Sequence, residues 1–275
     1  MNILISLTPS ESKRLIGIAV AQMVEVKTAL SENKILISNG TTTAYVAEEI
    51  LGIHLDIERF PCGVITDGVQ CQSPDSRVRS ILIDKGKFVQ TDETISDYEE
   101  LKDWIEGFGP NDIYIKGANA VDKEGNAGYL LAHPEGGNIM LALPKIAAQG
   151  SRFIIPVGLE KMVASVADAG RAVKGIRNYD YSYGRGCGYI TITNGIIITE
   201  IEAISMLTGA TATHVASGGV GGSEGSVTLS ISGKKEDVEK AVGIFNRVKG
   251  EDPVESWKKK CGDCPYKCSY MYNKC

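Results

Sequence analysis

Residues 111–137 read NDIYIKGANAVDKEGNAGYLLAHPEGG, and we interpret this stretch as the one on which the fold is organised. It opens with a short apolar run, Ile113–Ile115, which has the character of a buried parallel strand. A long loop rich in glycine and polar residues follows. Ligands of open α/β sheets bind just beyond the carboxyl ends of the strands. The stretch therefore predicts an active or binding site in the loop after this strand.

The candidate acids and bases of this loop are Asp122, Glu124, His133 and Glu135. Carboxylates and imidazoles act as general acids and bases when their pKa lies near the working pH. The alternative for His133 is an ordinary hydrogen-bonded loop residue. The concentration of these side chains in one loop favours catalysis.

Four further residues of the loop are candidate ligand-binding residues: Lys116, Gly117, Asn119 and Asn126. A lysine directly after a buried strand is placed to pair with a phosphate or a carboxylate, and glycine lets the backbone approach a ligand. The alternatives are a surface lysine at a strand end and asparagines that serve turn geometry.

A second strand–loop–helix unit is predicted at residues 34–51, KILISNGTTTAYVAEEIL. Gly40, Thr41, Thr42 and Thr43 form its loop. Backbone N–H groups and the positive end of the helix dipole attract anions, and the hydroxyls add donors. The alternative is a simple N-cap by Thr41 or Thr42. Three consecutive threonines after a glycine favour an anion site.

The alternation of strands and helices predicts an α/β domain over residues 1–178, with a mostly parallel sheet and flanking helices. A small α+β sandwich domain is expected over residues 179–250, where Asn194-Gly195 between two apolar runs indicates a hairpin. The glycine-rich loop at residues 218–222 lies between two predicted strands, and one role open to it is to close the site of the first domain.

The order of these pieces resembles a superfamily that contains ribose-5-phosphate isomerase, glucosamine-6-phosphate deaminase and the CoA transferases. Residues 116–122 (KGANAVD) are similar to the isomerase loop Asp-Gly-Ala-Asp-Glu-Val-Asp. The resemblance implies a phosphate site in the Gly40–Thr43 loop and isomerase or transferase chemistry. The two family aspartates are replaced by Lys116 and Asn119, which leaves Asp122, Glu124 or Glu135 as the base.

The net charge and the lack of long apolar runs argue against nucleic-acid and membrane partners. The chain has 275 residues and a net charge of −5, which argues against non-specific nucleic-acid binding. No apolar run reaches the roughly 18 residues of a transmembrane helix, and the N-terminus lacks the features of a secretory signal. We therefore expect a cytoplasmic protein with no membrane partner. A homo-oligomer is expected by analogy with other α/β proteins.

Residues 251–275 form a cysteine-rich tail. Cys261, Cys264, Cys268 and Cys275 are close enough in sequence to bind one metal, either zinc or an iron–sulfur cluster. The alternatives are reduced cysteines or a redox-sensitive pair.

Taken together, the two loops and the resemblance predict a protein that binds an anionic, phosphorylated small metabolite, with isomerase or transferase chemistry if it is an enzyme. The second hypothesis is a non-catalytic sensor or assembly factor that uses the cysteine tail.

Overall fold

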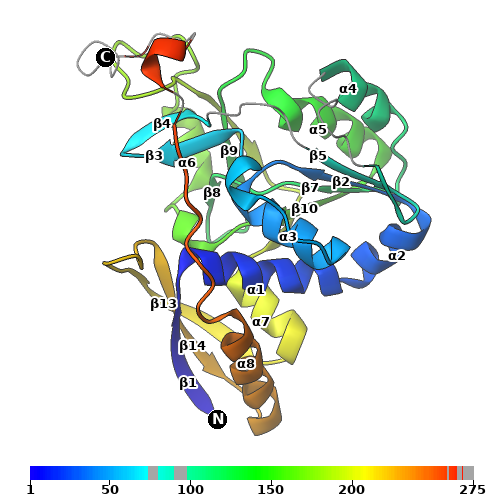
Figure 1. Ribbon diagram of the computed structural model, residues 1–275, viewed down its shortest axis with the longest axis vertical. Helices are drawn as coiled ribbons and strands as arrows, with labels where there is room; N and C mark the ends of the chain where they lie inside the picture. Colours follow the sequence, from blue (N-terminus) through cyan, green and yellow to red (C-terminus); the bar gives the residue numbers. More distant parts are fainter. Residues whose placement is uncertain (74–79, 90–97, 259, 265–267, 269–275) are drawn as a thin grey trace.

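The structure is a computed structural model that describes residues 1–73, 80–89, 98–258, 260–264 and 268. In these residues the chain is a mixed α/β protein built on a six-stranded sheet (Figure 1). The sheet has the order β12-β10-β7-β2-β5-β6 and consists of β2 (Lys34–Ser38), β5 (Ser80–Asp84), β6 (Lys87–Val89), β7 (Ile113–Ile115), β10 (Arg152–Pro156) and β12 (Ile196–Ile198).

The pairing within this sheet changes from one end to the other. Strands β12, β10, β7 and β2 run parallel, and β5 and β6 continue the sheet in antiparallel pairs. The α/β class is thus confirmed, with a sheet that is mixed. The ends of β2 and β7, which precede the two loops singled out in the sequence, lie side by side because Ile37 pairs with Ile115.

Helices cover both faces of the sheet. They are α1 (Pro9–Gln22), α2 (Val24–Glu32), α3 (Thr41–Leu51), α4 (Tyr98–Glu106) and α5 (Gly137–Gln149). Alternate strand residues enter two apolar clusters, because successive side chains of a strand point to opposite faces. Ile35 and Ile37 pack with α1, α2 and α3, while Leu36 packs with α4 and α5. Gly17 allows the close contact of α1 with α3, since a Cβ there would lie 3.0 Å from the Tyr45 carbonyl.

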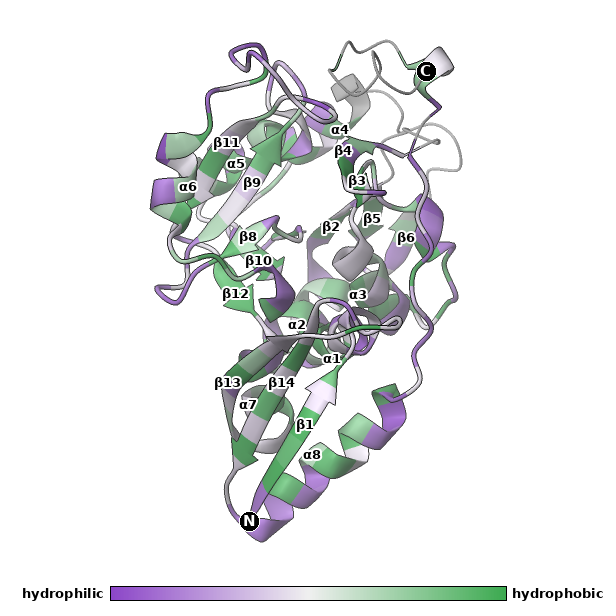
Figure 2. Cartoon of the chain, turned by 90° about the vertical axis from the view of Figure 1, so that its left-hand side faces the viewer, coloured by the Kyte–Doolittle hydropathy of each residue, from purple (hydrophilic) through white to green (hydrophobic). Residues whose placement is uncertain are grey.

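A second, antiparallel sheet lies beyond α1, at the lower end of the molecule in Figure 1. It has the order β1-β14-β13 and is accompanied by two helices: β1 (Asn2–Leu7), β13 (Thr211–Gly218), β14 (Ser226–Ser232), α7 (Glu200–Thr208) and α8 (Lys235–Val248). Figure 2 shows α8 with alternating apolar and polar residues, and its apolar face, including Phe245, is buried.

The two sheets do not follow the predicted boundary at residue 178. Strand β1, from the start of the chain, pairs with β14, and β12 lies in the six-stranded sheet although it follows the boundary. One apolar cluster also spans the two units, with Ile154 and Leu229 among its members. These pairings join residues far apart in the chain, so no local signal marks them.

The predicted hairpin around Asn194-Gly195 is wrong. Its first strand, β11 (Gly188–Ile192), pairs with β9 (Ala127–Leu131), and its second strand, β12, pairs with β10. Burial beside β10 outweighs the local turn preference of Asn-Gly. Gly195 is still required for packing, because a Cβ there would lie 2.2 Å from Cδ1 of Ile155.

The remaining strands are short and lie around the ends of the parallel strands. They are β8 (Ala120–Val121), which pairs with β9, and the hairpin of β3 (Gly63–Thr66) and β4 (Val69–Gln72). A short helix, α6 (Val166–Ala172), packs near β9 and β11. No helix in the described parts of the chain is both long and apolar enough to cross a membrane.

Candidate functional site

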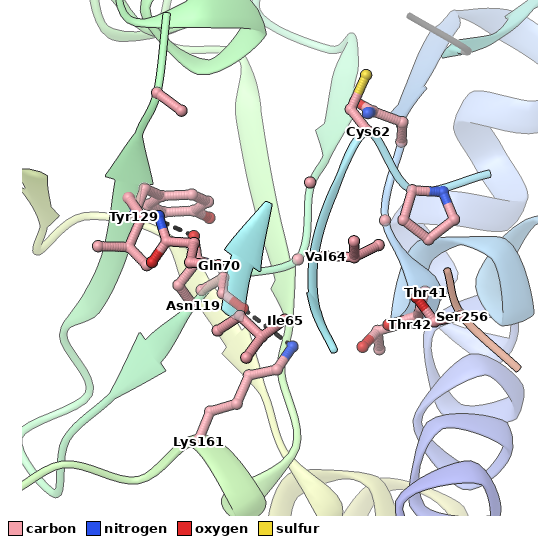
Figure 3. A pocket seen from close by; sticks show the side chains of 18 of the residues that line it. Thr41, Thr42, Cys62, Val64, Ile65, Gln70, Asn119, Tyr129, Lys161 and Ser256 are labelled. Atoms are coloured by element: carbon pink, nitrogen blue, oxygen red, sulfur yellow. Dashed lines mark hydrogen bonds between the residues drawn. The ribbon is translucent and has the colours of Figure 1, made fainter. Parts of the chain in front are cut away.

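A cavity of about 1100 Å³ lies at the carboxyl ends of β2 and β7. Its wall includes the loop after β2, the loop after β7 and the β3–β4 hairpin. Figure 3 shows Thr41 and Thr42 on one side of this space, with Asn119 and Tyr129 on the other. The two loops that the sequence predicted as site elements therefore line one cavity.

The first turn of α3 opens into this cavity. Its N-cap residue is Gly40, which has no side chain with which to cap the turn. The first intrahelical hydrogen bond runs from Ala44 N to Gly40 O, so the N–H groups of residues 41–43 precede the hydrogen-bonded ladder. Helices α1 and α7 differ, because the capping boxes of Thr8 and Thr199 satisfy their first turns. The N-terminus of α3 is thus left open toward the cavity.

The three threonines of α3 have different roles. Thr41 and Thr42 line the cavity. Thr42 is 2% exposed, and its hydroxyl is buried with no hydrogen-bond partner among the described residues. Thr43 is fully buried outside the lining, and its hydroxyl donates to the carbonyls of Ser38 (2.6 Å) and Gly40 (3.0 Å). Thr43 fixes the shape of the loop, while Thr42, a residue of the cavity wall, has a buried hydroxyl with no partner among the described residues.

Helix α5 also begins at the cavity. Its N-cap residue, Gly136, has a left-handed φ of 80°, and residues 136–139 line the wall. Asn138 Nδ2 donates to Asn39 Oδ1 over 3.3 Å, which ties the start of α5 to the loop after β2. Two helices therefore direct the positive ends of their dipoles toward the same space, which favours an anion there.

Lys116, at the end of β7, lines the cavity beside the α3 loop. Its Nζ lies 3.4 Å from Oγ of Ser38, the residue that ends β2. Burial lowers the pKa of the Lys116 ammonium to about 8, and only the charge of Cys62 opposes this effect. The next residue, Gly117, is in the wall as well, and a Cβ there would lie 3.3 Å from the Pro156 carbonyl.

Three further cations in the wall were not predicted: Lys13, Lys161 and Arg185. Burial lowers the pKa of Lys13; Glu160, 3.6 Å away, opposes this effect, and the charge of Lys161 lowers the pKa further. Lys161 Nζ donates to the Ala118 carbonyl over 3.1 Å, and an Arg185 N–H donates to the Ala132 carbonyl over 2.5 Å. These residues come from distant parts of the chain, and only folding brings them together.

Asp122, Glu124 and Asn126 are not part of the cavity wall. Asp122 is 4% exposed and accepts hydrogen bonds from the N–H groups of Glu124, Asn126 and Val166 and from Nδ2 of Asn126, over 2.9–3.2 Å. Burial opposes ionisation of Asp122, but these hydrogen bonds outweigh it and lower its pKa. Glu124 is exposed and lies 3.6 Å from Lys123. The structure therefore gives Asp122 and Asn126 a part in the turn and leaves Glu124 at the surface.

The other predicted polar residues do line the cavity. Asn119 accepts a hydrogen bond from Leu130 N at Oδ1 (3.0 Å), which turns its side chain toward β9. His133 Nδ1 accepts a hydrogen bond from Glu135 N (3.2 Å). His133 and Glu135 are exposed at the rim, so they are placed to contact a ligand at the mouth of the cavity.

Segments from elsewhere in the chain complete the wall. Cys62 and Cys71 line it from the β3–β4 hairpin, and Gly222 and Glu224 line it from the β13–β14 loop. The glycine-rich loop at residues 218–222 thus reaches the cavity through Gly222, a position compatible with a role in closing the site. Residues 253, 254 and 256 lie in the wall too, on the segment that runs from α8 up to the β3–β4 hairpin in Figure 1.

Hydrogen bonds hold this C-terminal segment at both of its ends. Glu251 accepts from Arg14 at 2.9 and 3.0 Å, and Arg14 also contacts Glu48 and Glu49 of α3. Further along, the Thr66 hydroxyl donates to the carbonyl of Ser256 over 3.3 Å. The segment therefore forms a fixed side of the cavity.

The predicted metal site is only partly within the described residues. Cys261, Cys264 and Cys268 lie within the described residues, and Cys275 lies outside them. No group of three or more histidine, cysteine, aspartate or glutamate side chains suited to a metal occurs in the described parts of the chain. Zinc or iron–sulfur binding by the tail stays a prediction.

Comparison of the chain with protein-family models, with curated proteins and with solved structures found no match. The resemblance to the isomerase and CoA-transferase superfamily therefore stays a prediction based on the order of elements and on the loop at residues 116–122.

Proposed function

We propose that the cavity binds a phosphorylated small metabolite, with its phosphate at the open N-terminus of α3. The observation that carries this proposal is the buried hydroxyl of Thr42, which lines the cavity and has no hydrogen-bond partner among the described residues. An unsatisfied buried hydroxyl is costly, and a bound phosphate oxygen would accept a hydrogen bond from it. The N–H groups of the same turn would bind the other oxygens.

The charge of the wall supports an anionic ligand. The wall contains more cationic than anionic side chains. The cations are Lys13, Lys116, Lys161 and Arg185, and the carboxylates are Glu135 and Glu224. Lys13 and Lys161 repel each other, since the charge of Lys161 lowers the pKa of Lys13. An anion between cations removes such repulsion. The protein as a whole has a net charge of −5, so this local excess of cations is a property of the cavity.

The size and composition of the cavity support a small organic ligand over a free ion. A volume of about 1100 Å³ is far larger than phosphate and is at the upper end of small-molecule sites. Apolar residues such as Val64, Ile65 and Leu131 lie in the same wall. The ligand we expect has a phosphate at α3 and a carbon skeleton that extends toward β9 and the β3–β4 hairpin.

Thermal unfolding with glycerol 3-phosphate, inorganic phosphate and glycerol at matched ionic strength tests this proposal. A ligand that binds the folded state raises the midpoint according to its occupancy. We expect both phosphate compounds to raise it and glycerol to leave it unchanged. Thr42→Val should weaken phosphate binding about tenfold, which corresponds to about 1.4 kcal/mol for one hydrogen bond to a charged group.

Thr213→Val is the matched control, because it makes the same substitution at a residue that is exposed on β13 and lies outside the wall. Its phosphate affinity should equal that of the unaltered protein. Equal affinities for Thr42→Val and Thr213→Val, or no midpoint shift with either phosphate compound, would contradict the proposal.

The isomerase or transferase chemistry predicted from the sequence has weaker support. Asp122, the residue that matched the isomerase loop, lies outside the wall with its oxygens already occupied. The carboxylates of the wall are Glu135 and Glu224, and Glu224 accepts a hydrogen bond from Gly222 N over 2.9 Å. Of the three candidate bases that the resemblance left, only Glu135 lines the wall, and Lys116 lies in the wall beside the loop that leads into α3.

A further inference from the structure

We propose that Lys116 is a nucleophile that forms a Schiff base with the carbonyl group of a phosphorylated aldehyde or ketone. This inference rests on the proposed phosphate site and names the class of compound bound there. It makes Lys116 a catalytic residue of the cavity, whereas the sequence analysis had given it only a role in ligand binding.

The first argument is position. Lys116 follows β7 directly, and its Nζ lies 3.4 Å from Oγ of Ser38 at the end of the neighbouring strand. The loop after Ser38 leads straight into the first turn of α3. A Cβ placed on Gly117 would lie 3.9 Å from Cβ of Thr42, so the residue next to Lys116 is near the turn that would hold the phosphate. A phosphorylated carbonyl compound would place its phosphate at the first turn of α3 and its carbonyl carbon at Lys116.

The second argument is the surroundings of the amine. No carboxylate of the described residues lies within ion-pair distance of Lys116 Nζ, which contacts Ser38 Oγ and is affected by the charge of Cys62. A carboxylate partner would keep the ammonium protonated. Burial without such a partner lowers the pKa of Lys116 to about 8, so a substantial fraction of the amine is neutral near physiological pH. Only the neutral amine attacks a carbonyl carbon.

The third argument is the comparison with the other lysines of the wall. Lys13 Nζ donates to the Pro9 carbonyl over 3.1 Å and lies 3.6 Å from Glu160, and Lys161 Nζ donates to the Ala118 carbonyl over 3.1 Å. These two amines are held as hydrogen-bond donors by backbone oxygens. Among the described residues, Lys116 Nζ has only the 3.4 Å contact to Ser38 Oγ, and Lys116 is therefore the lysine of the wall best suited to react.

The chemical step balances without a further reactant. The neutral amine attacks the carbonyl carbon, a C–N bond forms, and the π electron pair moves to oxygen. A proton moves from nitrogen to that oxygen and gives the carbinolamine. The hydroxyl then takes a proton from solvent and leaves as water, and a protonated imine remains. The positive imine lies beside the phosphate, whose negative charge stabilises it.

Reductive trapping tests the proposal. The protein is incubated with dihydroxyacetone phosphate and sodium cyanoborohydride, which delivers hydride to the protonated imine carbon and converts it to a stable secondary amine. Intact-mass analysis should show one adduct, and peptide mapping should place it on Lys116. Unphosphorylated dihydroxyacetone at the same concentration should give at least about tenfold less adduct, because it lacks the group that α3 binds.

Lys116→Arg is the main variant, because arginine keeps the positive charge but is not a nucleophile. It should retain the midpoint shift with glycerol 3-phosphate and lose the adduct. Lys240→Arg is the matched control, because Lys240 is exposed on α8 outside the wall, and it should retain both. The mapping on the unaltered protein does not depend on any variant folding.

Each outcome bears on one of the two proposals. An adduct on Lys116 that requires the phosphate group supports the Schiff base. An adduct spread over several lysines, or placed on Lys13 or Lys161, overturns it. Binding of glycerol 3-phosphate without any trapped adduct overturns the Schiff base and leaves the phosphate site in place. Absence of glycerol 3-phosphate binding counts against the phosphate site itself.

Discussion

The two polar loops that follow β2 and β7 differ in where their side chains find hydrogen-bond partners. In the loop after β7, Asp122 accepts four hydrogen bonds from its own turn and from the start of α6, and its oxygens face away from the cavity. In the loop after β2, the Thr42 hydroxyl has no hydrogen-bond partner among the described residues, the first turn of α3 has no side-chain cap, and Thr41 and Thr42 line the wall. In the loop with more acidic residues, the buried carboxylate of Asp122 therefore already has its hydrogen-bond partners within the protein.

This difference shows how a structural polar residue is told apart from a ligand-binding one. Both loops are rich in glycine and polar side chains, so both attract attention in the sequence. Buried polar groups are almost always paired, and a group left unpaired at a cavity needs a reason. Thr42 is such a group, and the anion that we propose would give the reason. Asp122 needs no ligand to account for its burial.

Substitution of Asp122 should have the largest effect on stability. Asp122→Ala leaves the N–H groups of Glu124, Asn126 and Val166 without their acceptor, so we expect a loss of about 4 kcal/mol in the free energy of unfolding. Urea unfolding measures this loss. At temperatures where the variant is folded, its affinity for glycerol 3-phosphate should equal that of the unaltered protein.

Glu124→Ala is the control for this substitution, because Glu124 is exposed and its side chain contacts Lys123 only at 3.6 Å. Its stability should change by less than about 0.5 kcal/mol. If Asp122→Ala were as stable as Glu124→Ala, the proposed structural role of Asp122 would be wrong.

A second buried carboxyl, that of Glu200, can be compared with Asp122 because only one of its two oxygens has a hydrogen-bond partner among the described residues. Glu200 Oε2 accepts from Leu159 N over 2.9 Å, while Oε1 is buried without a partner among the described residues. Burial raises the pKa of Glu200 to about 7, the charge of Glu160 adds to this, and hydrogen bonds oppose it. The folded protein thus holds a proton between about pH 4.5 and pH 7 that the unfolded chain releases.

This raised pKa gives the sign of the pH dependence. Because the folded state binds more protons in that interval, stability falls as pH rises from 4.5 to 7 and levels off above it. The contribution of Glu200 is about 3 kcal/mol. Glu200→Gln cannot ionise, so its stability relative to the unaltered protein should rise by up to this amount between pH 5 and pH 8. Urea unfolding at four pH values measures this difference in stability. If the free energy of unfolding depended on pH in the same way for both proteins, the proposed effect of Glu200 would be ruled out.

The smallest effect on stability is expected for Thr42→Val in the absence of ligand. Valine has nearly the same shape as threonine and lacks the unsatisfied hydroxyl, so the variant should be as stable as the unaltered protein or more stable by about 1 kcal/mol. Asp122 and Thr42 would then give opposite results, with one controlling stability and the other binding. A loss of stability in Thr42→Val would show that its hydroxyl has a partner in the folded protein and would remove the main support for the phosphate site.

Local patterns were sufficient for most helices and strands. The strands at residues 34–38 and 113–115 and the helix that ends at Leu51 are found where the sequence predicts them.

The sequence by itself determined the α/β class and the two loops at the site. A strand, a glycine and the start of a helix are local features, and the ends of parallel strands meet at one edge of a sheet. Tertiary structure decided the rest. It placed β1 and β12 in sheets distant from their neighbours in sequence, brought Lys13, Lys161 and Arg185 to the wall, and turned Asp122 inward. The reason is that strand pairing, charge neighbours and hydrogen-bond partners are set between residues far apart in the chain, where no short pattern records them.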